Sequence, residues 1–198
     1  MGALICSTIV FYLFSLKKYK SENLKSVAQK TILAIQNKDF DTLSTLIYPD
    51  KGVRFSPYTH VDIQKDIVFT SEQIKTFFQD TKKYLWGEQD GSGEPIELAP
   101  ADYFKRFIYD QDFAKAKEIA INKIIGHGNT INNISKVYPQ SSFVEYHFPG
   151  FDPKYGGMDW KSLRLIFEKW EKWEKWEKGE QKEGRWFLIG IVHDEWTI

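Results

Sequence analysis

Residues 185–198, with the sequence RWFLIGIVHDEWTI, form the most strand-like stretch of this chain. β-Branched and aromatic residues dominate it, and residues 187–192 are apolar on both faces of an extended strand. A strand that is apolar on both faces is covered on both sides, so we expect it to be central in its sheet. Polar side chains return only at its end, with His193 and Asp194.

The elements before this strand change character along the chain. The first half favours amphipathic helices, and the second half favours strands. We expect helices at 21–36, 40–48, 71–80 and 100–110, short strands at 53–58, 66–69 and 83–87, and longer strands at 142–148 and 162–167. Helices first and antiparallel strands later indicate an α+β fold, with a curved antiparallel sheet wrapped around the N-terminal helices.

Caps and turns set the expected boundaries. Ser21 and Ser71 are the expected N-caps of the first and third helices. Residues 88–97 read as a loop, and residues 126–129 as a turn, because both are rich in Gly and Asn or Asp. Residues 114–125 begin with a helical pattern and turn into a strand near their end.

Strict alternation along the last strand assigns its side chains to two faces. His193 shares its face with Phe187, Ile189 and Ile191, whereas Asp194 shares the other with Trp186, Leu188 and Trp196. A buried carboxylate needs a partner, and Arg164 in the strand at 162–167 is the expected one. Its guanidinium could bind Asp194 through a bidentate pair.

The N-terminal segment 1–20 stands apart from an expected single domain at 21–198. Residues 1–16 carry no charged side chain, but the run is shorter than the ~20 residues that span a bilayer and lacks a basic start. A truncated signal anchor, a short membrane tether and a buried helix all remain open, and Cys6 also suggests lipidation. We expect a membrane-anchored or extracytoplasmic protein, with a cytoplasmic location as the alternative.

A low-complexity insert at 168–179 repeats the triplet Glu-Lys-Trp. It lies between two expected strands, so one interpretation is a lengthened hairpin tip. The i,i+4 spacing of Glu and Lys favours a helix instead. A third interpretation is an exposed aromatic surface, with Trp170, Trp173 and Trp176, for a partner or a membrane.

Composition excludes several classes of function. Lys plus Arg equals Asp plus Glu at 27 each, which argues against a nucleic-acid partner. A single cysteine allows no disulfide framework, and the four histidines form no zinc motif. The stretch that contains Gly91 and Gly93 lacks the Gly-Lys-Ser/Thr ending of a phosphate-binding loop. We therefore expect no metal and no cofactor.

Six polar or aromatic residues are the candidates for a pocket. His147 shares a strand face with Glu145 and Phe143, and a histidine in such a place is either a satisfied core residue or part of a polar cluster at a pocket mouth. The candidates are Trp86, Tyr146, His147, Arg164, His193 and Asp194.

Three segments resemble an uncharacterised bacterial domain of cell-surface proteins and lipoproteins. They are GVRFSPY at 52–58, YLWGEQDGSGEPI at 84–96 and IGIVHDEWTI at 189–198. The order of elements, opening with residues 34–58, resembles the cone-shaped nuclear-transport-factor-like fold, and the resemblance covers roughly residues 22–198. It implies an extracytoplasmic setting and a pocket between sheet and helices.

Three functions follow as expectations. The first is a non-catalytic extracytoplasmic domain that binds a small ligand or a cell-envelope component. The second is a small isomerase or dehydratase with His147, His193 or Asp194 as acid–base residues, as the resemblance implies for some members. The third is a structural domain that assembles through the Trp-rich insert or forms a homodimer through its sheet.

Overall fold

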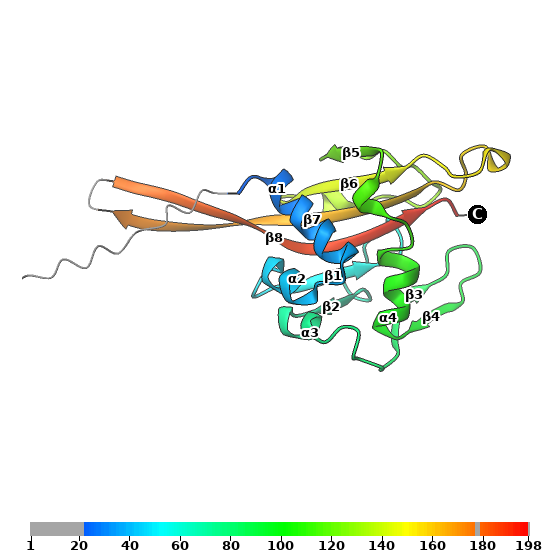
Figure 1. Ribbon diagram of the computed structural model, residues 1–198, viewed down its shortest axis with the longest axis horizontal. Coiled ribbons are helices and arrows are strands. Elements are labelled where there is room, and N and C mark those ends of the chain that lie inside the picture. The colour runs from blue at the N-terminus through cyan, green and yellow to red at the C-terminus, as the bar shows by residue number, and fades with distance from the viewer. Residues whose placement is uncertain (1–21, 177–178, 198) are drawn as a thin grey trace, which may run out of the picture.

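The computed structural model describes residues 22–176 and 179–197. Six strands form its main sheet, which Figure 1 shows as a twisted layer of arrows. The sheet order is β2–β1–β8–β7–β6–β5, and only the pair β1–β8 is parallel. The strands are β1 (Val53–Ser56), β2 (Ile67–Phe69), β5 (Glu118–Ile121), β6 (Ser142–Phe148), β7 (Lys161–Trp176) and β8 (Gly179–Glu195). The α+β class, a mostly antiparallel sheet and an interior position for β8 are thereby confirmed. The segment 1–20 and the expected cap Ser21 lie outside the described residues.

A bulge in β8 corrects the expected assignment of its faces. Ile166 pairs with Gly190 but Phe167 pairs with Leu188, so Ile189 is an extra residue in the ladder. The alternation shifts by one at this point. Leu188 and Ile191 therefore share the face of His193, whereas Ile189 joins Val192 and Asp194 on the other.

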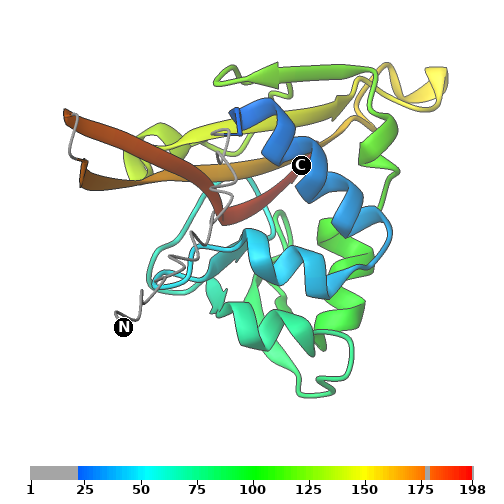
Figure 2. The same ribbon diagram turned by 60° about the vertical axis from the view of Figure 1, so that its left-hand side comes forward.

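Helices cover one face of the sheet (Figure 2). Helix α1 (Leu24–Gln36) begins after Asn23, whose side chain accepts the Ser26 N–H at 2.9 Å. Helix α2 (Phe40–Leu46) follows, and its buried Leu43 and Leu46 join the core. Within the described residues, no helix is long and apolar enough to cross a membrane.

The N-cap of the third helix lies one residue earlier than expected. Thr70, not Ser71, is the N-cap of α3 (Ser71–Lys75), and Thr70 and Gln73 form a reciprocal capping box. With Ser71 as the cap, the residue three positions later is Ile74. A capping box needs Gln or Glu at that position, so the expected cap gave no sign of this motif.

A π-helical turn orients the apolar side chains of residues 104–108 toward the core. Helix α4 (Pro100–Tyr103) continues as the π-helix Phe104–Ile108, which the Tyr109 N–H closes on the Phe104 carbonyl at 2.8 Å. This turn brings Phe104, Phe107 and Ile108 into the core together. The helical pattern expected from residue 114 is only a 3-10 turn at Phe113–Lys115.

A separate two-stranded sheet lies beside the helices. It pairs β3 (Tyr84–Glu88) with β4 (Pro95–Leu98), so residues 95–97 of the expected loop 88–97 lie in a strand. Trp86 is fully buried, stacks on Tyr103 with ring centroids 3.7 Å apart and donates its indole N–H to the Leu98 carbonyl.

The opposite face of the main sheet is covered by irregular chain and by α5 (Ile134–Val137). A second core forms there from Val61, Ile134, Ile166, Ile189 and Val192. The expected turn at 126–129 is irregular chain, with a bend at Asn129. Gly126 packs against the Trp160 ring so closely that a Cβ would lie 2.6 Å from it.

The Glu-Lys-Trp repeat continues β7 as a strand and not as a helix. Its backbone pairs with β8 up to Trp176 opposite Gly179, which makes a long two-stranded ribbon (Figure 1). The third strand, β6, stops pairing with β7 at Phe167. Trp170 is 40% exposed near the base of the ribbon, and the side chains of Trp173 and Trp176 lie outside the described part.

Candidate functional site

The six candidate residues are all buried, and the sheet separates them. Arg164, Asp194 and His147 lie on the face covered by irregular chain, whereas His193 and Tyr146 lie on the helix side. Trp86 belongs to the small β3–β4 sheet. The structure therefore does not bring the six together around one pocket.

Arg164 is the centre of a buried network and binds Asp194 as expected. Its Nη1 donates to Asp194 Oδ2 at 2.6 Å, and both side chains are almost fully buried. The pair is not bidentate, because Nη2 donates to Glu145 Oε1 at 3.1 Å. Thr59 Oγ1 and the Gly126 carbonyl accept the remaining Nη bonds.

Glu145 is the second carboxylate of this network. It accepts the N–H groups of Ile125 and Gly126 and the hydroxyl of Ser162, all at 2.7–2.9 Å. Burial raises the pKa of Glu145, but Arg164 and these donors outweigh burial and hold the pKa below its usual value. For Asp194 the balance is reversed: burial raises its pKa despite Arg164.

His147 attaches to the same network through Ser162, whose Oγ lies 2.8 Å from the His147 Nδ1. Burial lowers the pKa of His147, so the imidazole is neutral at pH 7. Neither His147, Arg164 nor Asp194 lines any of the described cavities. These groups hydrogen-bond to one another and join β6, β7 and β8, which is the chemistry of a structural core network.

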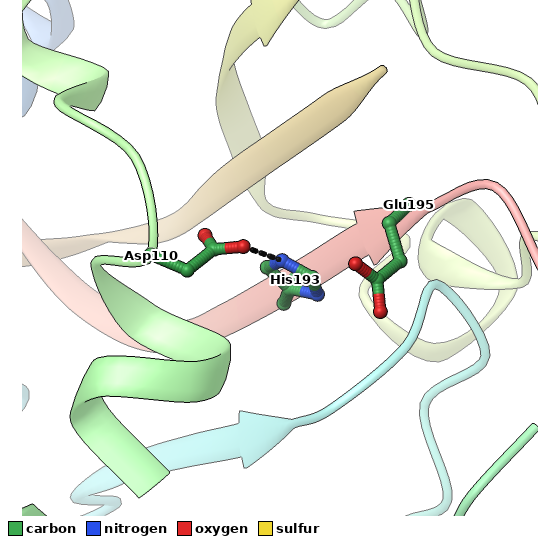
Figure 3. Close-up of side chains that lie close together, drawn as sticks. All are labelled: Asp110, His193 and Glu195. Atoms are coloured by element: carbon green, nitrogen blue, oxygen red, sulfur yellow. Dashed lines mark hydrogen bonds and ion pairs between the residues drawn. The ribbon is translucent and has the colours of Figure 1, made fainter. Parts of the chain in front are cut away.

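His193 occupies a different place, on the helix side of β8. Its Nδ1 lies 3.2 Å from the Pro57 carbonyl. Its Nε2 lies 3.4 Å from Asp110 Oδ2, the contact dashed in Figure 3. The ring is fully buried and meets the edge of Phe107. His193 thus links the chain after β1 and the chain after the π-helix to the central strand.

A compact ionic cluster surrounds this histidine. Lys161 forms ion pairs with Asp110 and with Glu195, the latter at 2.7 Å, and Arg106 binds Glu195 at 2.5 Å. Burial raises the pKa of Asp110, but His193 and Lys161 together hold it below the usual value. Sequence reasoning missed Asp110, Lys161 and Arg106, because they come from separate elements and share no spacing.

Asp110, His193 and Glu195 could in principle hold a metal ion, because one ligand atom of each lies within 4.8 Å of the others (Figure 3). The surroundings do not fit this role. The Lys161 ammonium already contacts both carboxylates, so a fixed cation of the protein neutralises the cluster. A divalent ion would have to displace that lysine.

An open cavity lies beside this cluster, and Trp86 and Tyr58 border it. We call it the acidic cavity; its volume is about 370 Å³. It is lined by Pro57, Tyr58, His60, Asp62, Lys65, Asp66, Trp86, Gly87, Glu88, Gln89, Asp90, Gly91, Gly93 and Thr130. Four of these side chains are carboxylates and one is a lysine.

The β3–β4 hairpin gives this cavity one of its walls. Gly87, Gly91 and Gly93 have φ values of 141°, 88° and 71°, which residues other than glycine rarely adopt. The loop is fixed to other parts of the chain, because Asp90 Oδ2 accepts the hydroxyls of Thr130 at 2.6 Å and Thr197 at 2.5 Å. The loop expected to be only a turn is therefore the wall of a cavity.

The carboxylates of the acidic cavity differ in protonation. Hydrogen bonds from Thr130 and Thr197 lower the pKa of Asp90, and the Gln64 N–H lowers that of Asp62. Burial raises the pKa of Asp66 to about 6, although Ser56 and the Asp62 N–H donate to its Oδ2. Above this value all three aspartates are ionised, and the cavity concentrates negative charge.

A second cavity of about 480 Å³ lies towards the base of the ribbon, and Arg54 of β1 and Glu168 of β7 belong to its lining. Its charged lining is mixed, with Lys51, Arg54 and Glu168. Lys51 is already paired with Glu168 at 2.6 Å, and Arg54 binds the carbonyls of Ile63 and Asp66. This cavity therefore has less uncompensated charge than the acidic cavity.

Comparison with known proteins gives this site no relative. No family model matches the chain, and neither a curated protein nor a solved structure matches it.

Proposed function

We propose that this chain is a non-catalytic ligand-binding domain, and that its acidic cavity binds a small organic cation with N–H donors. The observation that carries the proposal is the lining of that cavity: four carboxylates against one lysine around a volume of about 370 Å³. Such a volume lies at the small end of the range of about 300–1,000 Å³ for ligand pockets.

The choice of an N–H cation follows from the exposed atoms. Trp86 is fully buried and Tyr58 is only 9% exposed, so neither presents a free ring face for a quaternary ammonium group. Carboxylate oxygens remain, and these accept charge-assisted hydrogen bonds. A primary ammonium or a guanidinium group matches them.

The burial of the three expected acid–base residues supports binding over catalysis by them. His193 is fully buried between Pro57, Asp110 and Phe107, and His147 and Asp194 belong to the Arg164 network. A general acid or base must reach a bound substrate. The extracytoplasmic setting and a cell-envelope partner remain part of this proposal, supported by the resemblance of the three quoted segments.

Calorimetry with a matched pair of ligands tests the proposal. Putrescine should bind, and 1,4-butanediol, its neutral counterpart of similar length, should not. Glu88 lines the cavity, so Glu88→Gln should weaken putrescine binding several-fold. Glu97→Gln is the matched control, because Glu97 lies in the same hairpin but outside the lining.

Two results would contradict the proposal. Equal binding of putrescine and butanediol would mean that charge does not select the ligand. An equal effect of Glu88→Gln and Glu97→Gln would mean that the cation senses only the overall charge of the protein.

A further inference from the structure

β5 forms one of the two edges of the main sheet. β5 is the terminal strand, and among the described residues only β6 pairs with it (Figure 1). Its side chains Ile119 and Ile121 are 52% and 47% exposed. They lie opposite Tyr146 and Val144, which places them on the helix side of the sheet.

The hydrogen bonds at the end of β5 show which backbone groups face outward. Asn122 donates its N–H to the Phe143 carbonyl at 2.9 Å, so residue 122 faces β6. Backbone groups alternate along an antiparallel strand, so Glu118 and Ala120 also face β6. The N–H and C=O groups of Ile119 and Ile121 therefore point away from the sheet.

We propose that two copies of this chain pair through β5, antiparallel and related by a two-fold axis through Ala120. Ile119 of each copy then lies opposite Ile121 of the other copy, which gives two equivalent pairs. Each pair exchanges two N–H···O=C bonds, because both residues of the pair present their backbone groups outward. The two sheets become one continuous sheet.

Side chains fit the same register. Opposed residues in an antiparallel pair share a face, so the four isoleucines of the dimer gather on the helix side. Ala120 lies at the two-fold axis, and its small side chain points to the other face of the sheet. There it contacts only Ala120 of the second copy. A self-complementary edge of this kind matches a second copy of the chain better than an unrelated peptide.

The size of the edge sets the expected strength. β5 has only four residues, and short edge strands pair weakly. We therefore expect a dimer that dissociates on dilution, with a Kd between about 10 μM and 1 mM.

Sedimentation of the full chain over that concentration range tests the proposal. The parent chain should form dimers as its concentration rises, and Ile119→Lys should weaken the dimer about tenfold or more. Ile131→Lys is the matched control, since Ile131 is 77% exposed and lies outside β5, in the chain that follows it. It should leave the dimer unchanged.

A mixing experiment tests the register. Ile119→Lys and Ile121→Glu chains should each dimerise poorly alone, but together they should form a heterodimer, because residue 119 lies opposite residue 121. A dimer that tolerates Ile119→Lys would overturn the proposal. A chain that stays monomeric at all concentrations would also overturn it. In that case, slow hydrogen exchange at the Ile119 and Ile121 amides would show that another segment covers the edge.

Discussion

Arg164 shows how a single residue can hold three strands together. Its guanidinium lies between two buried carboxylates, Glu145 and Asp194, which belong to β6 and β8. The partner Asp194 could be predicted from the sequence, because a buried aspartate needs a cation. Glu145 could not, because its contact depends on the register that places it opposite Arg164 across β6 and β7.

Removing this cation should strongly destabilise the protein. Arg164→Ala leaves both carboxylates buried without their counter-charge, which should lower the free energy of unfolding by about 3–5 kcal/mol. Urea denaturation would measure the loss. Lys51→Ala is the control: its pair with Glu168 is exposed, so it should cost less than about 1 kcal/mol. Similar losses for the two variants would contradict a buried structural role.

Asp66 should make stability depend on pH. Its pKa is about 6 in the folded state, above the ordinary value of 3.8, so between these values the folded protein binds more protons than the unfolded chain. The stability contribution of Asp66 therefore falls as the pH rises from about 4 to about 7. With a discount for partial exposure, the change is about 1–2 kcal/mol.

Asp66→Asn should remove this dependence. As the pH rises from about 4 to about 7, the free energy of unfolding of the variant should increase relative to that of the parent. Urea unfolding at both pH values measures this difference. A parent and variant with parallel pH profiles would show that the Asp66 carboxyl titrates normally.

At the scale of elements, periodic segments were predictable and interruptions were not. β6 has the bounds expected from its β-branched and aromatic residues, and α1 follows its helical spacing. The bulge at Ile189 left no signal in the sequence, because an apolar run on both faces hides a one-residue shift. The strand β4 was missed because glycine-rich turn residues directly precede it.

The ribbon made by the ends of β7 and β8 should contribute little to stability. Neither strand has a third neighbour among the described pairs beyond Phe167 and Leu188, and isolated two-stranded ribbons are marginally stable. Replacing residues 172–183 by Asn-Gly should form a tight turn and change the melting temperature by less than about 3 °C. A large fall in calorimetry would show that the repeat packs on the rest of the domain.

For the whole molecule, the uneven placement of charge matters more than its total. The chain is neutral overall, yet the Lys161 cluster is balanced and the acidic cavity beside it is not. The balanced composition argued against a nucleic-acid partner but could not reveal this cavity. Its lining comes from three stretches, 57–66, 86–93 and Thr130, which the fold brings together.

Chemical-shift mapping tests the cation site most directly. Adding putrescine to the labelled full chain should shift the backbone amides of Asp62, Gly91 and Gly93, which line the acidic cavity, and 1,4-butanediol should leave them in place. Shifts confined to the mixed-charge cavity around Arg54 and Ser141, or shifts equal for the two ligands, would contradict the assignment of the acidic cavity as a cation-binding site.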